Sequence, residues 1–276
     1  MKRVVLSEVS TVCLIVVLSS FFSCSKDDLL FDEGRSSINL FKNSVKSQDS
    51  IISFSVLGNS ISTYKGYIPS SYKYFSKYVP SNFDVEDTWW MRFKNLSGFE
   101  LYSNASWSGS TVVNDGASNK DSYFTSEKRL AELGSKGNPD YIVVLGGTND
   151  WGQNKELGDF PLKDSFNMGT FRGAYSYLIK RICELYPDAT IVCCSILPRK
   201  GYDAPNKKGW YIRDGNLSIE TIASRYDCVY VNLDGCGLQE DFGKYTMDGL
   251  HPNELGMELI ANEIYYKIME LISIKR

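Results

Sequence analysis

The chain almost lacks histidine, since only His251 is present among its 276 residues. Imidazole is the one side chain whose ordinary pKa lets it accept and return a proton near neutral pH. Any reaction that needs such a base therefore has a single candidate. The chain also has no Cys-x-x-Cys pair, and one histidine cannot complete a zinc site with the cysteines. The sequence thus predicts neither a metal site nor a second general base.

Cysteines are few beyond Cys24, and their number is odd: they are Cys183, Cys193, Cys194, Cys228 and Cys236. An odd number leaves at least one thiol without a disulfide partner inside a monomer. Cys193 and Cys194 stand in an apolar run, where small buried thiols are common. We interpret all five as structural, and a Cys228–Cys236 disulfide is left open.

Three further features are missing: an excess of one charge, internal repeats, and a second long apolar run beyond the N-terminus. The net charge is -3, with acidic and basic residues interspersed, so no nucleic-acid surface is expected. Aromatic residues are instead abundant, with 18 Tyr, 14 Phe and 5 Trp. Such a composition fits either a surface that faces sugars or a densely packed core.

The N-terminus resembles the signal peptide of a bacterial lipoprotein. A basic start is followed by the apolar run 11–22, which is too short to span a bilayer comfortably. The run ends at Ser23-Cys24, as in a lipobox, although Phe21 stands where Leu is usual. Residues 25–28 (SKDD) resemble the acidic export tag of surface lipoproteins in the Bacteroides group. An ordinary signal peptide with an incidental cysteine is the alternative.

This reading divides the chain into a signal peptide at 1–23, a lipidated polar tether at 24–48 and one domain at 49–276. Lipidation of Cys24 would anchor the protein in the cell envelope, and the lipid would be its only contact with a membrane. We expect an outer-membrane lipoprotein exposed at the cell surface. A periplasmic orientation is the alternative.

Within the domain, strand patterns alternate with helical ones. The strand candidates are 51–57, 99–102, 141–145, 190–197 and 228–233, and the helix candidates are 85–96, 127–133, 166–186 and 254–272. This alternation predicts an α/β sandwich with a mostly parallel sheet. Active sites in such folds form at the carboxyl ends of the strands.

Polar residues follow the strand candidates at four places. The first strand runs into Gly58-Asn59-Ser60, where a glycine permits a tight turn that exposes a hydroxyl, although a helix N-cap would also favour serine. The stretch does not fit the Gly-x-Ser-x-Gly elbow. Gly109 follows the second strand and could present its backbone N–H, and Asn149 follows the third with an uncharged amide donor. Each of these two is equally compatible with a plain turn.

The fourth place is Asp248-Gly249-Leu250-His251, in which the aspartate could orient the histidine. Taken in order, the four places resemble the sequence blocks of the SGNH (GDSL-type) hydrolase superfamily. Asn59 departs from this pattern, because the superfamily usually has Asp there, and the departure bears on how the serine turn is held.

The resemblance implies a flavodoxin-like three-layer α/β/α sandwich with about five parallel strands. It also implies a serine esterase that works through an acyl-enzyme and needs no metal or cofactor. Ser60 would be the nucleophile, His251 the base and Asp248 its orienting group. The backbone N–H groups of Ser60 and Gly109 and the amide of Asn149 would form the oxyanion hole.

The substrate is not fixed by these residues. A surface lipoprotein of this kind is expected to remove O-acetyl groups from carbohydrates. Trp107, Trp151 and Trp210 lie in or near loops and could stack on sugars or simply pack on the core. One alternative is a lipid esterase or lysophospholipase, which should have an apolar trough beside Ser60. The other is a non-catalytic glycan-binding lipoprotein on the same fold.

Overall fold

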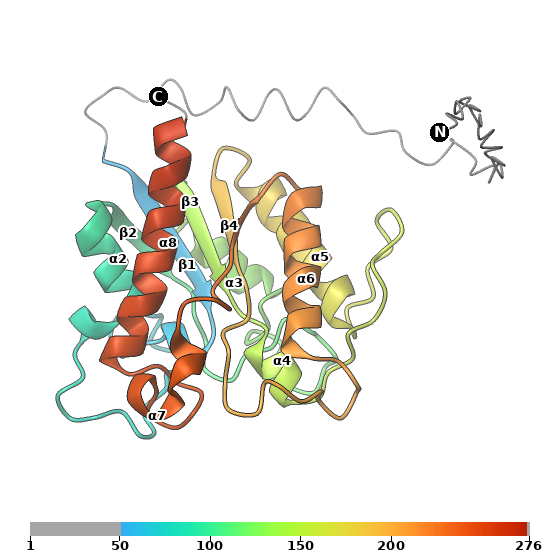
Figure 1. The fold of residues 1–276 in the computed structure, drawn as a ribbon. Coiled ribbons are helices and arrows are strands. Elements are labelled where there is room, and N and C mark those ends of the chain that lie inside the picture. Colours follow the sequence, from blue (N-terminus) through green and yellow to red (C-terminus); the bar gives the residue numbers. More distant parts are fainter. Residues whose placement is uncertain (1–50, 275–276) are drawn as a thin grey trace, which may run out of the picture.

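A computed structural model describes residues 51–274, so the signal peptide, Cys24 and the tether lie outside the described residues. The chain forms one parallel sheet in the order β2-β1-β3-β4-β5 (Figure 1). The strands are β1 (Ser53–Gly58), β2 (Glu100–Asn104), β3 (Tyr141–Leu145), β4 (Thr190–Cys194) and β5 (Val229–Val231). The predicted three-layer α/β fold is confirmed.

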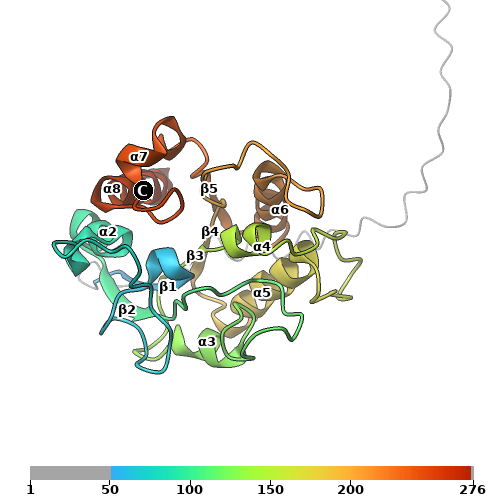
Figure 2. The ribbon, with the colours of Figure 1, turned by 90° about the horizontal axis from the view of Figure 1, so that it is seen from below.

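Helices cover both faces of the sheet because its central strands are apolar on both sides. Along β3, Val143 packs into one core and Val144 into the other, since successive strand residues point to opposite faces. On one face lie α2 (Trp89–Ser97) and α8 (Glu254–Ile274). On the other lie α3 (Glu127–Glu132), α5 (Phe171–Leu185) and α6 (Ile212–Arg225), as Figure 2 shows.

Two predicted helices have different bounds in the structure. The helix expected at 85–96 is divided into a 3-10 turn, η3 (Val85–Asp87), and α2, because the Thr88 hydroxyl caps a new helix by accepting the N–H of Met91. The helix expected at 166–186 begins only at Phe171. The Asn167 side chain accepts the N–H of Gly169 in a local turn that competes with helical hydrogen bonds.

Helix α6 had no counterpart in the sequence prediction. Its buried face includes Gly215 and Asn216, which interrupt the apolar period. A Cβ on Gly215 would lie 2.9 Å from the ring of Trp210, and the Asn216 side chain accepts the N–H of Ile196 at 2.8 Å. Close packing thus requires a glycine and a polar residue on the buried face of α6. Because these residues are not apolar, the sequence lacks the periodicity that predicts an amphipathic helix.

The cysteine prediction can also be compared with the structure. Within residues 51–274 no disulfide is formed, so the alternative of a Cys228–Cys236 bond is wrong. The thiol of Cys228 instead lies 3.9 Å from that of Cys183. In the same part of the chain, no helix is both long and apolar enough to cross a membrane.

The carboxyl ends of the strands meet at one edge of the sheet, at the lower end of the molecule in Figure 1. This edge carries three short helical segments: η2 (Ser60–Ser62) after β1, α4 (Thr148–Gly152) after β3, and α7 (Phe242–Tyr245) before α8. The irregular segment 63–84 also begins here, directly after η2. The edge thus gathers all four of the polar places predicted from the sequence.

Candidate active site

Ser60 stands in a tight turn immediately after β1. A side chain on Gly58 would meet Ser106 Oγ at 2.8 Å, so only glycine fits there. Asn59 Oδ1 accepts the N–H of Ile61 at 3.0 Å and caps η2. This bond needs only an acceptor oxygen, which Asn supplies as well as the usual Asp. The replacement therefore leaves the serine turn well held.

The turn brings Ser60 against His251, although 191 residues separate them in the sequence. Ser60 Oγ lies 2.9 Å from Nε2 of His251, and Nδ1 lies 2.8 Å from Oδ2 of Asp248. The other carboxylate oxygen of Asp248 accepts the backbone N–H groups of His251 and Leu250. A carboxylate held this way favours the tautomer with its proton on Nδ1, which leaves Nε2 free to accept the serine proton.

The electrostatics of the pair suit a base. Burial lowers the pKa of His251 below its ordinary value; Asp248 opposes that shift and the Arg199 cation adds to it. Partial burial by itself would raise the pKa of Asp248, but the hydrogen bonds from His251 and Leu250 lower it overall. At neutral pH the imidazole is therefore neutral and the carboxylate ionised, as proton abstraction requires.

Two backbone N–H groups, of Ser60 and Gly109, and the side-chain amide of Asn149 make up the possible oxyanion donors. Gly109 has a left-handed backbone, with φ of 82°, and is exposed. Asn149 lies in α4, and its amide donates one N–H to Ser110 O at 2.8 Å, which leaves the second N–H for a ligand. No hydrogen bond among residues 51–274 uses the backbone N–H of Ser60 or Gly109. These donors are thus available for a developing negative charge.

The buried residue Asp150 fixes the Gly109 loop to α4. Its two carboxylate oxygens accept the N–H groups of Val112 at 3.0 Å and Val113 at 2.8 Å. Burial raises the pKa of this carboxyl to about 7, even though both hydrogen bonds favour the charged form. Asp150 directly follows Asn149 in the sequence, but no local pattern there points to this role.

Arg129 is a second buried support that the sequence did not reveal. Its guanidinium is fully buried and donates to the carbonyls of Gly58, Ala105 and Ser122 at 2.6–2.8 Å. Desolvation lowers its pKa to about 9. Since Gly58 and Ala105 follow β1 and β2, this side chain holds the ends of both strands together. Nothing in the charged stretch around Arg129 distinguishes it from a solvated arginine.

A cavity of about 360 Å³ opens beside Ser60 and His251. Its wall is mainly aromatic and aliphatic: it includes Ile61, Tyr64, Tyr74, Phe75, Val79, Phe83, Met247, Pro252 and Met257. Most of this wall belongs to the segment 63–84. The apolar trough expected for a lipid esterase is therefore present next to Ser60.

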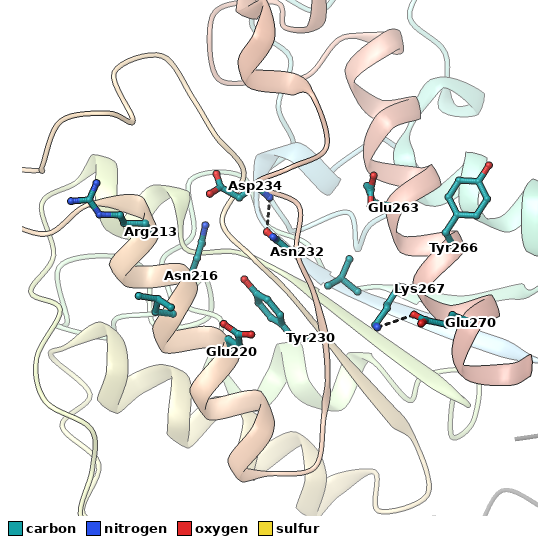
Figure 3. Close-up of a pocket in the computed structure, with 12 residues that line it drawn as sticks. Arg213, Asn216, Glu220, Tyr230, Asn232, Asp234, Glu263, Tyr266, Lys267 and Glu270 are labelled. Carbon is teal, nitrogen blue, oxygen red and sulfur yellow. Dashed lines mark hydrogen bonds and ion pairs between the residues drawn. The ribbon is translucent and has the colours of Figure 1, made fainter. Parts of the chain in front are cut away.

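A larger hollow of about 750 Å³ lies elsewhere, between α6 and α8 beside β5 (Figure 3). Its lining is mostly polar, with Glu220, Tyr230 and Asp234 on one side and Glu263 and Lys267 on the other. It includes none of the triad or oxyanion residues.

No group of three or more His, Cys, Asp or Glu residues in the described chain could hold a metal ion.

The three tryptophans considered as sugar platforms differ in their environment. Trp210 is only 3% exposed, stacks on Phe171 and donates its indole N–H to Lys155 O, so it packs in the core. Trp151 is half-buried beneath the Arg199 guanidinium. Trp107 is also half-buried and packs on Tyr72. A stacking role for Trp210 is therefore wrong.

Known proteins share both the sequence family and the fold of this chain. The family of GDSL-like lipases and acylhydrolases matches residues 52–268. A protein from Bacteroides ovatus assigned to the GDSL-like lipases is 28% identical, with a TM-score of 0.62 over 80% of this chain and 99% of its own. A second such protein, from Bacteroides uniformis, is 28% identical, with a TM-score of 0.63 over 80% and 97%.

A more distant similarity is to a family two carbohydrate esterase from Clostridium thermocellum. It is 19% identical, with a TM-score of 0.55 over 80% of this chain and 64% of that one, which shows a shared fold. No curated protein sequence matches the chain.

Proposed function

Since this chain belongs to the GDSL-like lipase/acylhydrolase family and is a hydrolase of ester bonds, we propose that Ser60 is its nucleophile and that the reaction passes through an acyl-enzyme. The observation that carries the proposal is the hydrogen-bonded series from Asp248 through His251 to Ser60 Oγ. The glycan-binding alternative requires none of these contacts. Their retention in one connected set supports catalysis.

The steps follow from this geometry. Nε2 of His251 takes the proton of Ser60 as Oγ attacks the ester carbonyl, and the N–H groups of Ser60, Gly109 and Asn149 hold the oxyanion. His251 then protonates the leaving alcohol, which departs and leaves the acyl group on Ser60. A water molecule enters, gives a proton to Nε2 of His251 and attacks the acyl carbonyl. His251 returns that proton to Ser60 Oγ as the bond between Oγ and the acyl carbon breaks, and the acid leaves.

For the substrate, two classes of ester are supported by different observations. O-acetyl groups on carbohydrates are favoured by the cell-envelope localisation that the sequence predicts. A carbohydrate esterase also shares the fold. The apolar cavity beside Ser60 instead favours esters that carry a longer aliphatic or an aromatic group. Because this cavity adjoins the nucleophile itself, it is the more direct of the two supports.

One experiment separates the two classes. The purified protein is assayed against nitrophenyl esters of increasing acyl length, beside acetate release from a panel of acetylated glycans. A kcat/KM that rises from acetate to medium-length acyl esters supports use of the cavity. A maximum at acetate with release from glycans supports the carbohydrate class. Inertness toward every ester would contradict the proposed function.

We also propose that Cys24 is lipidated and anchors the domain in the cell envelope. The support is the short apolar run before Ser23-Cys24 and the polar tether that follows. A lipid anchor at Cys24 would place the active site outside the cytoplasm, where extracellular esters are accessible.

A further inference from the structure

We propose that Phe75 is a positioning residue for the catalytic imidazole: its ring packs flat on His251, and its backbone is tied to the Ser60 turn. This inference rests on the proposed role of Ser60 and His251. The two ring centroids lie 3.6 Å apart with the planes inclined by 12°. Phe75 belongs to the irregular segment 63–84, for which the sequence predicts neither an element nor a site residue.

The stack supplies a restraint that the hydrogen bonds of His251 do not. The lone pair and the N–H of an imidazole lie in the plane of its ring, so hydrogen bonds at Nδ1 and Nε2 restrain the ring along that plane. They resist sliding of the ring, but leave it able to rock about the line that joins the two nitrogens. A flat ring against one face opposes that rocking and excludes water from the face. Catalysis is sensitive to such errors, since a misplacement of 1 Å can cost on the order of 10² in rate.

Thr63 links the position of Phe75 to the nucleophile. The backbone N–H of Phe75 donates to Thr63 Oγ1 at 2.9 Å, and that hydroxyl donates to the carbonyl oxygen of Ser60, also at 2.9 Å. Ser60 Oγ in turn contacts His251. The four residues thus form a closed circuit. The Phe75 ring packs on the base, the Thr63 hydroxyl bonds to the backbone of Ser60, and the Phe75 N–H joins these two supports.

The residues just before Phe75 extend this support to the oxyanion loop. The carbonyl of Lys73 accepts the N–H of Ser108 at 2.7 Å, next to Gly109. The ring of Tyr72 packs on Trp107, with centroids 4.6 Å apart. The segment 72–75 therefore contacts the nucleophile turn, the base and one loop of the oxyanion hole.

The charged groups around His251 define what a pH profile should report. Asp248 lies on its own loop, Arg199 on the loop after β4, and Lys77 follows Phe75 on the irregular segment, near Asp248. Burial is the largest influence on the pKa of His251 and lowers it. Removal of the Phe75 ring should therefore expose the imidazole to water and raise that pKa.

The test measures hydrolysis of nitrophenyl acetate by the wild type and by Phe75→Ala, Phe75→Leu and Phe75→Tyr. The small acetyl group is chosen because Phe75 also lines the cavity that would hold larger groups. We expect kcat to fall about 10- to 100-fold in Phe75→Ala, with the acid limb of the kcat profile moved to higher pH. Phe75→Tyr keeps a flat ring and should stay near wild type. Phe75→Leu fills space without a flat face, and it should show the loss even where Phe75→Ala fails to fold.

Thr63 provides a paired check, since Thr63→Ser keeps the bridging hydroxyl and Thr63→Val removes it. Only Thr63→Val should lower kcat. Tyr78→Ala is the matched control, because Tyr78 is 59% exposed on the same segment and does not line the cavity. If the Phe75→Leu protein has the kcat and the acid limb of the wild type while Ser60→Ala is inactive, the role of Phe75 is overturned and the proposed function stands. An active Ser60→Ala protein would overturn the proposed function instead.

Discussion

Both nitrogens of the His251 ring are engaged, one with the carboxylate of Asp248 and the other with the hydroxyl of Ser60. One face of the ring is covered by Phe75. A lone histidine in a sequence could be incidental, but no polar atom of this side chain is left to serve another purpose. In the proposed mechanism it is the base that takes the proton of Ser60.

The lowered pKa of His251 predicts the pH dependence of hydrolysis. The neutral imidazole is the active form, so kcat/KM should be constant near pH 7 and fall with unit slope only below the ordinary histidine pKa. Arg199→Gln removes a cation that disfavours the imidazolium, and it should therefore move this limb to higher pH. An acid limb that moves to lower pH in this variant would contradict the assigned electrostatics.

The amide of Asn149 is predicted to act mainly in the transition state. Asn149→Ala should lower kcat by about 10²–10³ with a small change in KM, because the oxyanion exists only during the reaction. Asn95→Ala, which removes an exposed amide on α2, is the control and should leave kcat unchanged. Steady-state kinetics on one nitrophenyl ester measure kcat and KM of the two variants. A raised KM with unchanged kcat in Asn149→Ala would instead assign Asn149 to ground-state binding.

At the residue scale, the sequence identified side chains that carry chemistry but not those that hold them. Ser60, Asp248 and His251 stand in short blocks whose spacing is itself informative, and the structure brings them into contact. Phe75 and Arg129 act through contacts with segments distant in the sequence. No local pattern encodes such contacts.

Among the elements, the loops after β2 and β3 depend on one buried carboxylate. Asp150 accepts two backbone N–H groups of the Gly109 loop, and its pKa is raised to about 7. An acid whose folded pKa is raised stabilises the fold below its unfolded pKa, and this contribution is lost as pH rises through the folded value. Its contribution to the free energy of unfolding should therefore decline between about pH 4 and pH 7.

Asp150→Asn tests this support. The amide nitrogen would face the N–H of Val112 or Val113, leaving a buried donor unsatisfied at a cost of about 1–3 kcal/mol. Urea unfolding at several pH values measures that cost and should show a weaker pH dependence than the wild type. Asp203→Asn, at an exposed position, is the control and should unfold like the wild type. An Asp150→Asn protein of wild-type stability would contradict the role.

At the element scale, prediction succeeded where burial is simple. The apolar run 141–145 gave β3 with its bounds, because both of its faces are buried. Helix α6 escaped prediction because Gly215 and Asn216 occupy its buried face. Helix α5 was extended too far toward the N-terminus because the Asn167 turn is polar and local. Tertiary contacts decided the first case, and a local side-chain hydrogen bond decided the second.

For the whole molecule, packing on both faces of the sheet determines the length and position of the strands. The carboxyl ends of these strands then determine where the candidate site lies. The alternation of strands and helices predicted an α/β sandwich with a mostly parallel sheet and the edge at which the polar residues gather. The three layers and the number of strands were implied by the resemblance to the SGNH hydrolases. The segment 63–84 was not predictable, because it has no periodicity and packs on loops from several parts of the chain. The apolar cavity therefore became visible only in the structure.

The location of the whole molecule gives a separate prediction. In cells that express the full chain, the proposed lipidation of Cys24 predicts that the protein fractionates with membranes and incorporates labelled palmitate. Cys24→Ser should abolish the label, whereas Cys13→Ser, which removes the other N-terminal cysteine, should not. Palmitate on the Cys24→Ser protein would contradict the proposed anchor.

The most direct test of the central claim is to identify the residue that becomes acylated. The folded domain is treated with a fluorophosphonate, which modifies an activated serine hydroxyl, and the modified peptide is sequenced by mass spectrometry. The account predicts one adduct, on Ser60, which is absent from Ser60→Ala, together with a fall in kcat on the order of 10⁶ in that variant. An adduct on Ser62 or another serine, with hydrolysis retained in Ser60→Ala, would contradict it.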